Sequence, residues 1–526
     1  MSNRLGILAG IPILGFLGWL LWTQLIGPGD FGAWQRELLS DYQEIDPEAV
    51  SRYREGNIEM YPGFIYRLAP RDEAQRQRIE NFWREKREER LEFDRNRLDS
   101  TQQRYMDRLA VMEKEWLDLP RQWWAMNLFQ PLTGIQVELP LFLAYRHHIS
   151  SPEDCKGYIY RLRELPARLS EALLETEKAA ADGWVLDSTS LAETVKQIRI
   201  IAATPVKEQL LYRSFGTRIT RLDPTVINEY QSLDFLIEAA TELEENILPT
   251  LTILADRLEK LSPAPSLPEN IFEILVQVRA GTMLDLNDVS AQIESRFRET
   301  TVNEALANTA LALNHEEVLR EITRSTAGIL PQYPQQDARI RFYPQEYADL
   351  RPRLLKSTRD EALFPILMLS DSTDERELML DIYQFGVPGA AWLQQLEVES
   401  NAAAWLMMAD QSASEEGWGL TALGLLQSKL LWFSRDSLLL QAYEHRLARA
   451  TTLAWLDISI HHKGLSPQTA QEQLAAKGWT TAPQLIEQVI TSPGSFVAIW
   501  YWWQTWEAKA MSCPTLLPDC LNDFLR

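Results

Sequence analysis

Cysteine and histidine are scarce in this sequence, with three Cys and six His among 526 residues. Zinc fingers and disulfide scaffolds need several cysteines at short spacings, so the few widely spaced cysteines exclude both. Cys513 and Cys520 are close enough to pair across a short Pro-bounded loop in an oxidising compartment, which would leave Cys155 free. Three unpaired buried thiols fit the sequence equally well, so the state of the cysteines stays open.

Positive charge is also deficient, because 52 Lys and Arg face 74 Asp and Glu, for a formal net charge of -22. A surface this acidic repels nucleic-acid phosphates, which predicts that nucleic acid is not a partner. Gly-rich phosphate loops, Gly-x-Ser-x-Gly nucleophile elbows and repeats of fixed period are absent as well. The composition, 45% hydrophobic and 24% charged, is that of a folded globular protein.

The N-terminus carries an apolar run from Leu5 to Ile26, interrupted only by Thr23 and Gln24. This run is long enough to cross a bilayer, and no small-x-small cleavage site follows it. Residues 1–30 are therefore predicted to be an uncleaved signal anchor, the alternative being a buried core helix. Arg4 precedes the run, so the positive-inside tendency keeps the N-terminus cytoplasmic and places residues 31–526 outside the cytoplasm.

The remaining sequence is typical of a mainly α-helical protein with a small β element. Between Arg71 and Leu117 it is strongly helical, with alternating charges that indicate a solvated, salt-bridged helix face. Short β-like runs cover 338–343 and 364–369. Further helical patterns occur at 152–180, 187–215, 227–262, 285–325, 376–409, 416–432, 436–461, 467–477, 482–490 and 495–511.

Several sequence elements in fixed order resemble the bacterial family catalogued as domain of unknown function 885. In the N-terminal half these are the segments 131–136, 139–140 and 158–166. In the C-terminal half, which is the better match, Glu416-Gly417-Trp418-Gly419-Leu420 resembles the family's Glu-Gly-Trp-Ala-Leu element. A helix with Arg449, Asp457 and His461 in step with the family follows it, and the resemblance covers nearly all of residues 31–526.

The resemblance implies a large zincin-like helical domain and zinc-dependent hydrolysis through a His-Glu-x-x-Pro-Gly-His-His signature. In that chemistry imidazoles hold zinc in an open site and the Glu takes a proton from the metal-bound water. The corresponding stretch here keeps Pro388 and Gly389. The His, the Glu and both later His positions are Gln384, Phe385, Ala390 and Ala391. No metal and no cofactor are expected, since these side chains cannot form the usual zinc site.

Four residues are candidates for a remnant pocket: Glu416, Arg449, Asp457 and His461. Glu416 has two interpretations, a surviving metal ligand or an acidic residue favoured by the dipole near a helix N-terminus. Asp457 and His461 are four residues apart on a helix, a spacing that suits a hydrogen-bonded pair holding one imidazole tautomer. Such a pair serves structure as well as catalysis.

The sequence thus predicts a catalytically inactive, membrane-anchored relative of zinc metallohydrolases. Its expected role is that of a binding or interaction module for a protein, peptide or envelope ligand, with the membrane as a further partner through the N-terminal helix. The resemblance to a bacterial family places it in the inner membrane as a single-pass protein with its main domain in the periplasm. The alternative is a peptidase-like hydrolase with a relocated or non-standard active site.

Overall fold

The computed structural model describes residues 30–53, 66–263, 269–302, 320, 322, 339–347, 350, 353–355, 366–370, 375–399, 404–427 and 437–512. The anchor expected at Leu5–Ile26 and the cysteines Cys513 and Cys520 lie outside these residues. In the part that the structure describes, no helix combines the length and the apolar character needed to cross a membrane. Cys155 is buried and free.

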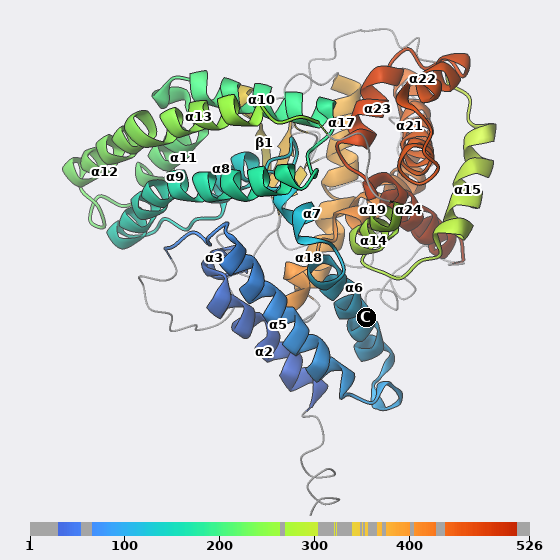
Figure 1. The fold of residues 1–526 in the computed structure, drawn as a ribbon, viewed down its shortest axis with the longest axis horizontal. Helices are drawn as coiled ribbons and strands as arrows, with labels where there is room; N and C mark the ends of the chain where they lie inside the picture. The colour runs from blue at the N-terminus through green and yellow to red at the C-terminus, as the bar shows by residue number, and fades with distance from the viewer. Residues whose placement is uncertain are drawn as a thin grey trace, which may run out of the picture.

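Three groups of helices make up the molecule (Figure 1). The basal helices are α2 (Phe31–Ile45), α3 (Pro47–Tyr53), α5 (Glu73–Leu91) and α6 (Ser100–Leu117). The N-terminal lobe contains α7 (Arg121–Met126), α8 (Ile135–Tyr145), α9 (Pro152–Ala181), α10 (Ser188–Ala203), α11 (Leu210–Ile219), α12 (Glu229–Glu242) and α13 (Leu248–Leu258). The C-terminal lobe contains α14 (Glu269–Ala280), α15 (Leu286–Glu299), α17 (Glu375–Phe385), α18 (Ala390–Glu399), α19 (Ser412–Gln427), α21 (Ser437–His461), α22 (Pro467–Ala476), α23 (Ala482–Ile490) and α24 (Ser495–Ser512).

The mainly α-helical class with a small β element is confirmed, and most predicted helices agree with the structure within a few residues. The stretch 376–409 differs, because α17 ends at Phe385 and α18 begins after the turn that contains Pro388 and Gly389. A proline lacks the amide hydrogen that a continuous helix needs. The stretch 187–215 also divides, into α10 and α11, with Pro205 between them.

Local sequence sets the helix starts. Asp99 and Gln102 form a reciprocal capping box at the start of α6, as do Asn228 and Gln231 at α12. Ser151 caps α9, and Pro152 follows at the first helical position, where its missing amide hydrogen costs nothing. Each cap pairs backbone amides that have no partner inside the helix.

A three-stranded sheet lies between the two lobes. Its strands are β1 (Arg339–Phe342), β2 (Arg353–Leu355) and β3 (Ile366–Leu369), in the order β1-β3-β2, with β1 parallel and β2 antiparallel to β3. Side chains alternate across a strand. Leu367 and Leu369 therefore pack into the core of the C-terminal lobe, while Met368 packs into the core of the N-terminal lobe. Both predicted strands are confirmed, and β2 was not predicted.

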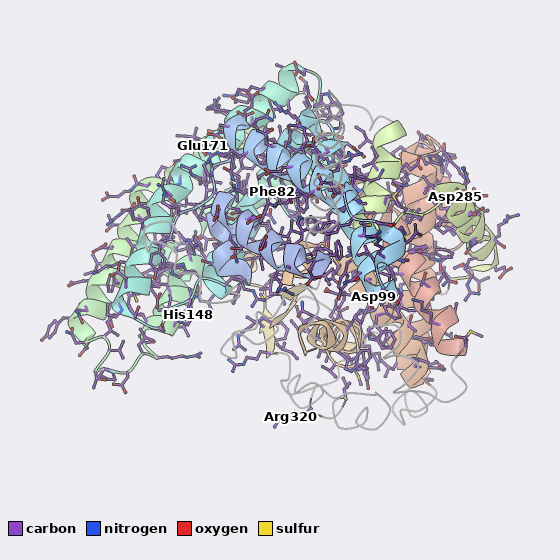
Figure 2. All side chains as sticks on the ribbon, turned by 90° about the horizontal axis from the view of Figure 1, so that it is seen from below. Phe82, Asp99, His148, Glu171, Asp285 and Arg320 are labelled. Atoms are coloured by element: carbon purple, nitrogen blue, oxygen red, sulfur yellow. The ribbon has the colours of Figure 1, made fainter. Side chains whose placement is uncertain are left out.

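The basal helices have a core of their own. Leu38 of α2, Trp83 of α5 and Leu109 of α6 are fully or almost fully buried together with Trp405, which comes from the C-terminal part of the chain. Arg90 and Glu113 join α5 to α6 by two hydrogen bonds of 2.7 Å. Both side chains are buried, so this pair lies in the contact between the helices and not on the solvated face that the sequence predicted. Figure 2, seen from below, shows Phe82 of α5 in the middle of the molecule, with His148 of the N-terminal lobe on one side and Asp285 of the C-terminal lobe on the other.

Candidate functional site

The two segments that resemble the family's signature elements are in contact. The turn between α17 and α18 contains Pro388, and the Trp418 side chain of α19 donates a 2.8 Å hydrogen bond to its carbonyl oxygen. The Trp418 ring also stacks on Trp392 of α18, with ring centroids 5.0 Å apart. Both indoles are buried. The structure thus brings residues 384–391 and 416–419 together, although they are separate in sequence.

Glycines allow this close approach. A Cβ atom on Gly389 would lie 1.9 Å from the carbonyl oxygen of Gln384, and one on Gly419 would lie 2.3 Å from the same oxygen. Both distances are far shorter than a carbon atom tolerates, and both involve backbone that cannot rotate away. The two glycines are therefore required by backbone packing, with or without a metal.

The positions where the resemblance places metal-binding side chains are packed. Ala390 and Ala391 are 1% and 0% exposed, and Phe385 contributes its ring to the core of the C-terminal lobe. Gln384 is also buried. Apolar side chains supply no lone pairs for a metal ion, so Gln384 is the one position of the four with a ligand atom.

That ligand atom is already engaged by a cation of the protein. Arg446 of α21 donates a 3.1 Å hydrogen bond from Nη1 to Oε1 of Gln384. Its Nη2 contacts Oε2 of Glu377 at 2.5 Å and Oδ1 of Asp381 at 2.8 Å. Glu377, Asp381 and Gln384 lie on α17 at spacings of four and three residues, which places them on one helix face. We call these four residues the Arg446 cluster.

Burial and charge set the protonation of the Arg446 cluster. Burial raises the pKa of Asp381 to about 6, although Arg446 attracts the ionised form. For Glu377 burial acts in the same direction, but Arg446 outweighs it and the pKa is lowered. Burial lowers the pKa of Arg446, and the two carboxyl groups reverse this and raise it. The cluster therefore contains an arginine cation opposite a firmly ionised Glu377 and a weaker acid, Asp381.

A zinc ion does not fit this arrangement. Zinc in hydrolases takes several imidazole and carboxylate ligands in a tetrahedral arrangement, with one position left open. Here a neutral amide is the donor at the motif, and the guanidinium beside it would repel a divalent cation. Among the residues that the structure describes, no three His, Cys, Asp or Glu side chains form a group that could hold a metal ion.

The predicted remnant residues have separate structural partners. Arg449 of α21 donates a 2.7 Å hydrogen bond to Oε1 of Gln488 on α23. His461, also on α21, donates from Nε2 to the carbonyl oxygen of Val489 on α23, with 3.1 Å between nitrogen and oxygen. Glu416 lies on α19 and is half-buried. Arg449 and His461 are separated along α21 by about 18 Å, at 1.5 Å per residue.

Asp457 differs from the expectation most clearly. Its Oδ1 accepts a hydrogen bond from the amide of Gly494 at 3.0 Å, and its Oδ2 accepts from Phe496 and Val497 at 3.1 and 3.2 Å. These amides belong to the start of α24, so Asp457 caps that helix rather than bonding to His461. The tautomer of His461 is set by Val489 instead.

Asp457 is fully buried and His461 is half-buried, and the loss of contact with water shifts the pKa values of both. Burial raises the pKa of Asp457 to about 7, with the three amide donors acting in the opposite direction. Burial lowers the pKa of His461, although its hydrogen bond to Val489 opposes the shift. His461 is therefore a neutral imidazole near pH 7.

The sequence did not reveal the Arg446 cluster. The available signal was the polar stripe of Glu377, Asp381 and Gln384 on an otherwise apolar helix, which required a buried cation nearby. The partner cation comes from a helix more than sixty residues further along the chain, and nothing in the local sequence distinguishes Arg446 from its neighbours.

Comparisons with known proteins place this geometry in context. The family model described as bacterial protein of unknown function (DUF885) matches residues 60–359, a segment that ends before Gln384. The structure is similar to "the putative lipoprotein from Colwellia psychrerythraea", with a TM-score of 0.73 and 13% identity over 91% of this chain and 92% of that one. It is also similar to "a putative lipoprotein of unknown function from Shewanella oneidensis", with a TM-score of 0.56 and 12% identity over 94% and 97% of the chains. No curated protein matches the sequence. At these identities the two structures establish the fold alone.

Proposed function

The chain belongs to the bacterial DUF885 family of proteins of unknown function, and from this premise we propose that it is a catalytically inactive relative of zinc metallohydrolases. It acts as a binding or interaction module in the cell envelope, anchored in the inner membrane through residues 1–30, with residues 31–526 in the periplasm. The zincin-like relationship comes from the signature resemblance at residues 384–391 and 416–419.

The contact between Arg446 and Gln384 is the observation that carries this proposal. A metal ion and a guanidinium cannot share one small buried space, because their charges repel and there is too little room. The cation opposite Glu377 and Asp381 is instead supplied by the protein. This arrangement makes the fold independent of a bound metal.

The envelope location agrees with the description of each of two structurally similar proteins as a "putative lipoprotein". The acidic surface, with a net charge of -22, favours a protein, peptide or other envelope ligand over nucleic acid.

The alternative, a hydrolase with a relocated site, would use Glu416 of α19 together with Asp457 and His461 of α21. Both oxygens of Asp457 accept backbone hydrogen bonds, and the Nε2 hydrogen of His461 is directed at the Val489 carbonyl. A general base needs a free lone pair. His461 keeps one on Nδ1, because the neutral ring donates through Nε2. Asp457, however, is held at α24 and does not orient the His461 ring, which favours the binding role.

Elemental analysis of the full chain, purified in detergent, tests the proposal. We expect no stoichiometric zinc and no change in Tm when a strong chelator is added, because a metal that binds the folded state stabilises it and its removal lowers the Tm. Peptidase and esterase substrates should remain intact. Near-equimolar zinc together with chelator-sensitive hydrolysis would refute the inactive assignment.

A further inference from the structure

A large cleft opens between the two lobes, away from the Arg446 cluster. Its volume is about 1480 Å³. One wall consists of α7 and the segment 183–190 that leads into α10. The other consists of the last residues of α21, the first turns of α22 and one side of α23 from Pro483 to Ile490. His461, at the end of α21, lines this cleft and is about 22 Å along the helix from Arg446, at 1.5 Å per residue.

Apolar side chains form the floor and one wall of the cleft. Trp123 and Trp184 line it, and they pack on Ile271 and Leu275 in the cluster that joins the lobes. Ile486 and Ile490 of α23 contribute to the opposite wall. Aromatic and aliphatic surface of this kind stabilises a ligand by removing apolar groups from water.

The charged side chains that line the cleft are Asp187, Glu487 and Lys463, so acidic and basic groups nearly balance. Asp187 caps α10 by accepting from the amides of Thr189 and Ser190. Lys463 forms an ion pair with Glu294. A chain with a net charge of -22 thus presents an almost neutral cleft, which favours an uncharged ligand.

Side-chain amides provide the hydrogen-bonding capacity that remains. Gln468 and Gln471 of α22 are exposed at the mouth of the cleft. A carboxamide both donates and accepts, so it matches the amide and carbonyl groups of a peptide backbone.

The cleft continues into a groove along α10. The groove has a volume of about 680 Å³ and shares Ser188 and Pro263 with the cleft. Leu191, Val195 and Leu261 give it apolar surface. Lys196, Arg199 and Glu259 also line it, and Arg199 and Glu259 form an ion pair. Together the two spaces exceed the roughly 300–1,000 Å³ of ordinary small-molecule pockets, and they suit an elongated ligand.

We infer that the cleft and the α10 groove bind an extended, uncharged polypeptide segment with apolar side chains. The tryptophans and isoleucines receive the apolar side chains, and Gln468 and Gln471 bond to the backbone. A glycan fits less well, because Leu191, Val195 and Leu261 present surface that has no hydrogen-bonding group for its hydroxyls. This inference rests on the proposed binding function and gives that function a ligand class.

Two matched substitutions on α22 test the site. Gln471→Trp fills the mouth of the cleft, whereas Gln473→Trp places the same side chain at an exposed position that does not line it. Both glutamines are exposed, so both variants should keep the parent Tm. The probe is an uncharged, capped peptide of about twelve residues, extended to about 40 Å, in which Leu or Val alternates with Gln or Ser. Its binding to the full chain in detergent is measured by calorimetry.

We expect the peptide to bind the parent, Gln471→Trp to weaken binding by about tenfold or more, and Gln473→Trp to stay within about twofold. No peptide binding, or equal affinity in both variants, would overturn the assignment of the site. Binding of a chitin oligosaccharide in place of the peptide, lost in Gln471→Trp, would overturn the ligand class. Mass spectrometry of the recovered peptide tests the proposed lack of catalysis separately from the proposed binding site. Cleaved peptide would contradict the inactive function while the cleft remains its binding site.

Discussion

Asp457→Ala provides a demanding test of the structural role assigned to the remnant residues. The carboxylate is fully buried and accepts hydrogen bonds from three backbone amides at the start of α24. The first amides of a helix have no partner inside the helix, so Asp457 is their acceptor. Alanine removes that acceptor and leaves the three amides in an interior that excludes water.

The magnitude follows from these contacts. Each buried donor left without a partner costs about 1–3 kcal/mol. Asp457→Ala should therefore lower the free energy of unfolding by at least about 3 kcal/mol, taking the lower end of that range for each amide. Asp457→Asn keeps one acceptor oxygen but directs an NH2 group at the remaining amides, so we expect a smaller loss of about 1–3 kcal/mol.

Urea denaturation followed by circular dichroism measures both changes. Asp285→Ala is the matched control, since Asp285 accepts from the amides of Asn287 and Asp288 at the start of α15 in an exposed position at the edge of the molecule (Figure 2). Water replaces a lost cap there, and the cost should be about 1 kcal/mol. An Asp457→Ala variant no less stable than Asp285→Ala would refute the capping role.

Two further predictions concern buried charge. Arg446→Met should lower the free energy of unfolding by about 3–5 kcal/mol, because Glu377 and Asp381 remain buried without their cation. Arg163, which pairs with Glu238 on the surface, provides the control, and a smaller loss for Arg446→Met than for Arg163→Met would contradict the prediction. The pKa values of Asp381 and Asp457, raised by burial to about 6 and about 7, exceed the unfolded value of about 3.9, so the folded state holds these protons more tightly. Their contribution to stability is complete below pH about 4 and is lost as the pH rises to about 7. The urea midpoint of the parent should therefore fall as the pH rises from about 4 to about 7. Asp381→Asn and Asp457→Asn should each make this fall smaller.

The fold class follows from local sequence patterns. Periodicity and caps predicted 436–461 and 482–490, and the structure has α21 at Ser437–His461 and α23 at Ala482–Ile490. Strand β2 was missed because its three residues are too few to show alternation, and it exists only through pairing with β3. The helix predicted at 376–409 was too long, because the apolar pattern of the sequence continues past the turn at Pro388 whereas α17 ends at Phe385.

The candidate site was predictable only in part. The motif positions were located by resemblance, but their burial beside Trp392 and Trp418 depends on tertiary packing. The spacing of four residues on one helix predicted that Asp457 pairs with His461. Its true partners lie on α24, roughly forty residues away. The cleft was not predicted, since its walls come from segments that are distant in sequence and share no pattern.

Gly419 stands where the family element that this segment resembles has Ala, and close packing against α17 explains the glycine here and leads to a final prediction. A Cβ atom at position 419 would lie 2.3 Å from the carbonyl oxygen of Gln384, so α19 can approach the end of α17 only without a side chain. Gly419→Ala should therefore force the helices apart and lower the free energy of unfolding by about 1–3 kcal/mol, the usual cost of overpacking.

Gly424→Ala on the same helix is the matched control. The one heavy atom within 4 Å of its added Cβ is the Tyr443 hydroxyl at 3.2 Å, a contact that a shift of a few tenths of an ångström relieves. Because alanine favours a helix over glycine by about 1 kcal/mol, this variant should be as stable as the parent or more stable. Equal urea midpoints for the two variants would show that close packing does not maintain Gly419. The glycine at position 419 would then need another explanation, such as a ligand that approaches the turn between α17 and α18.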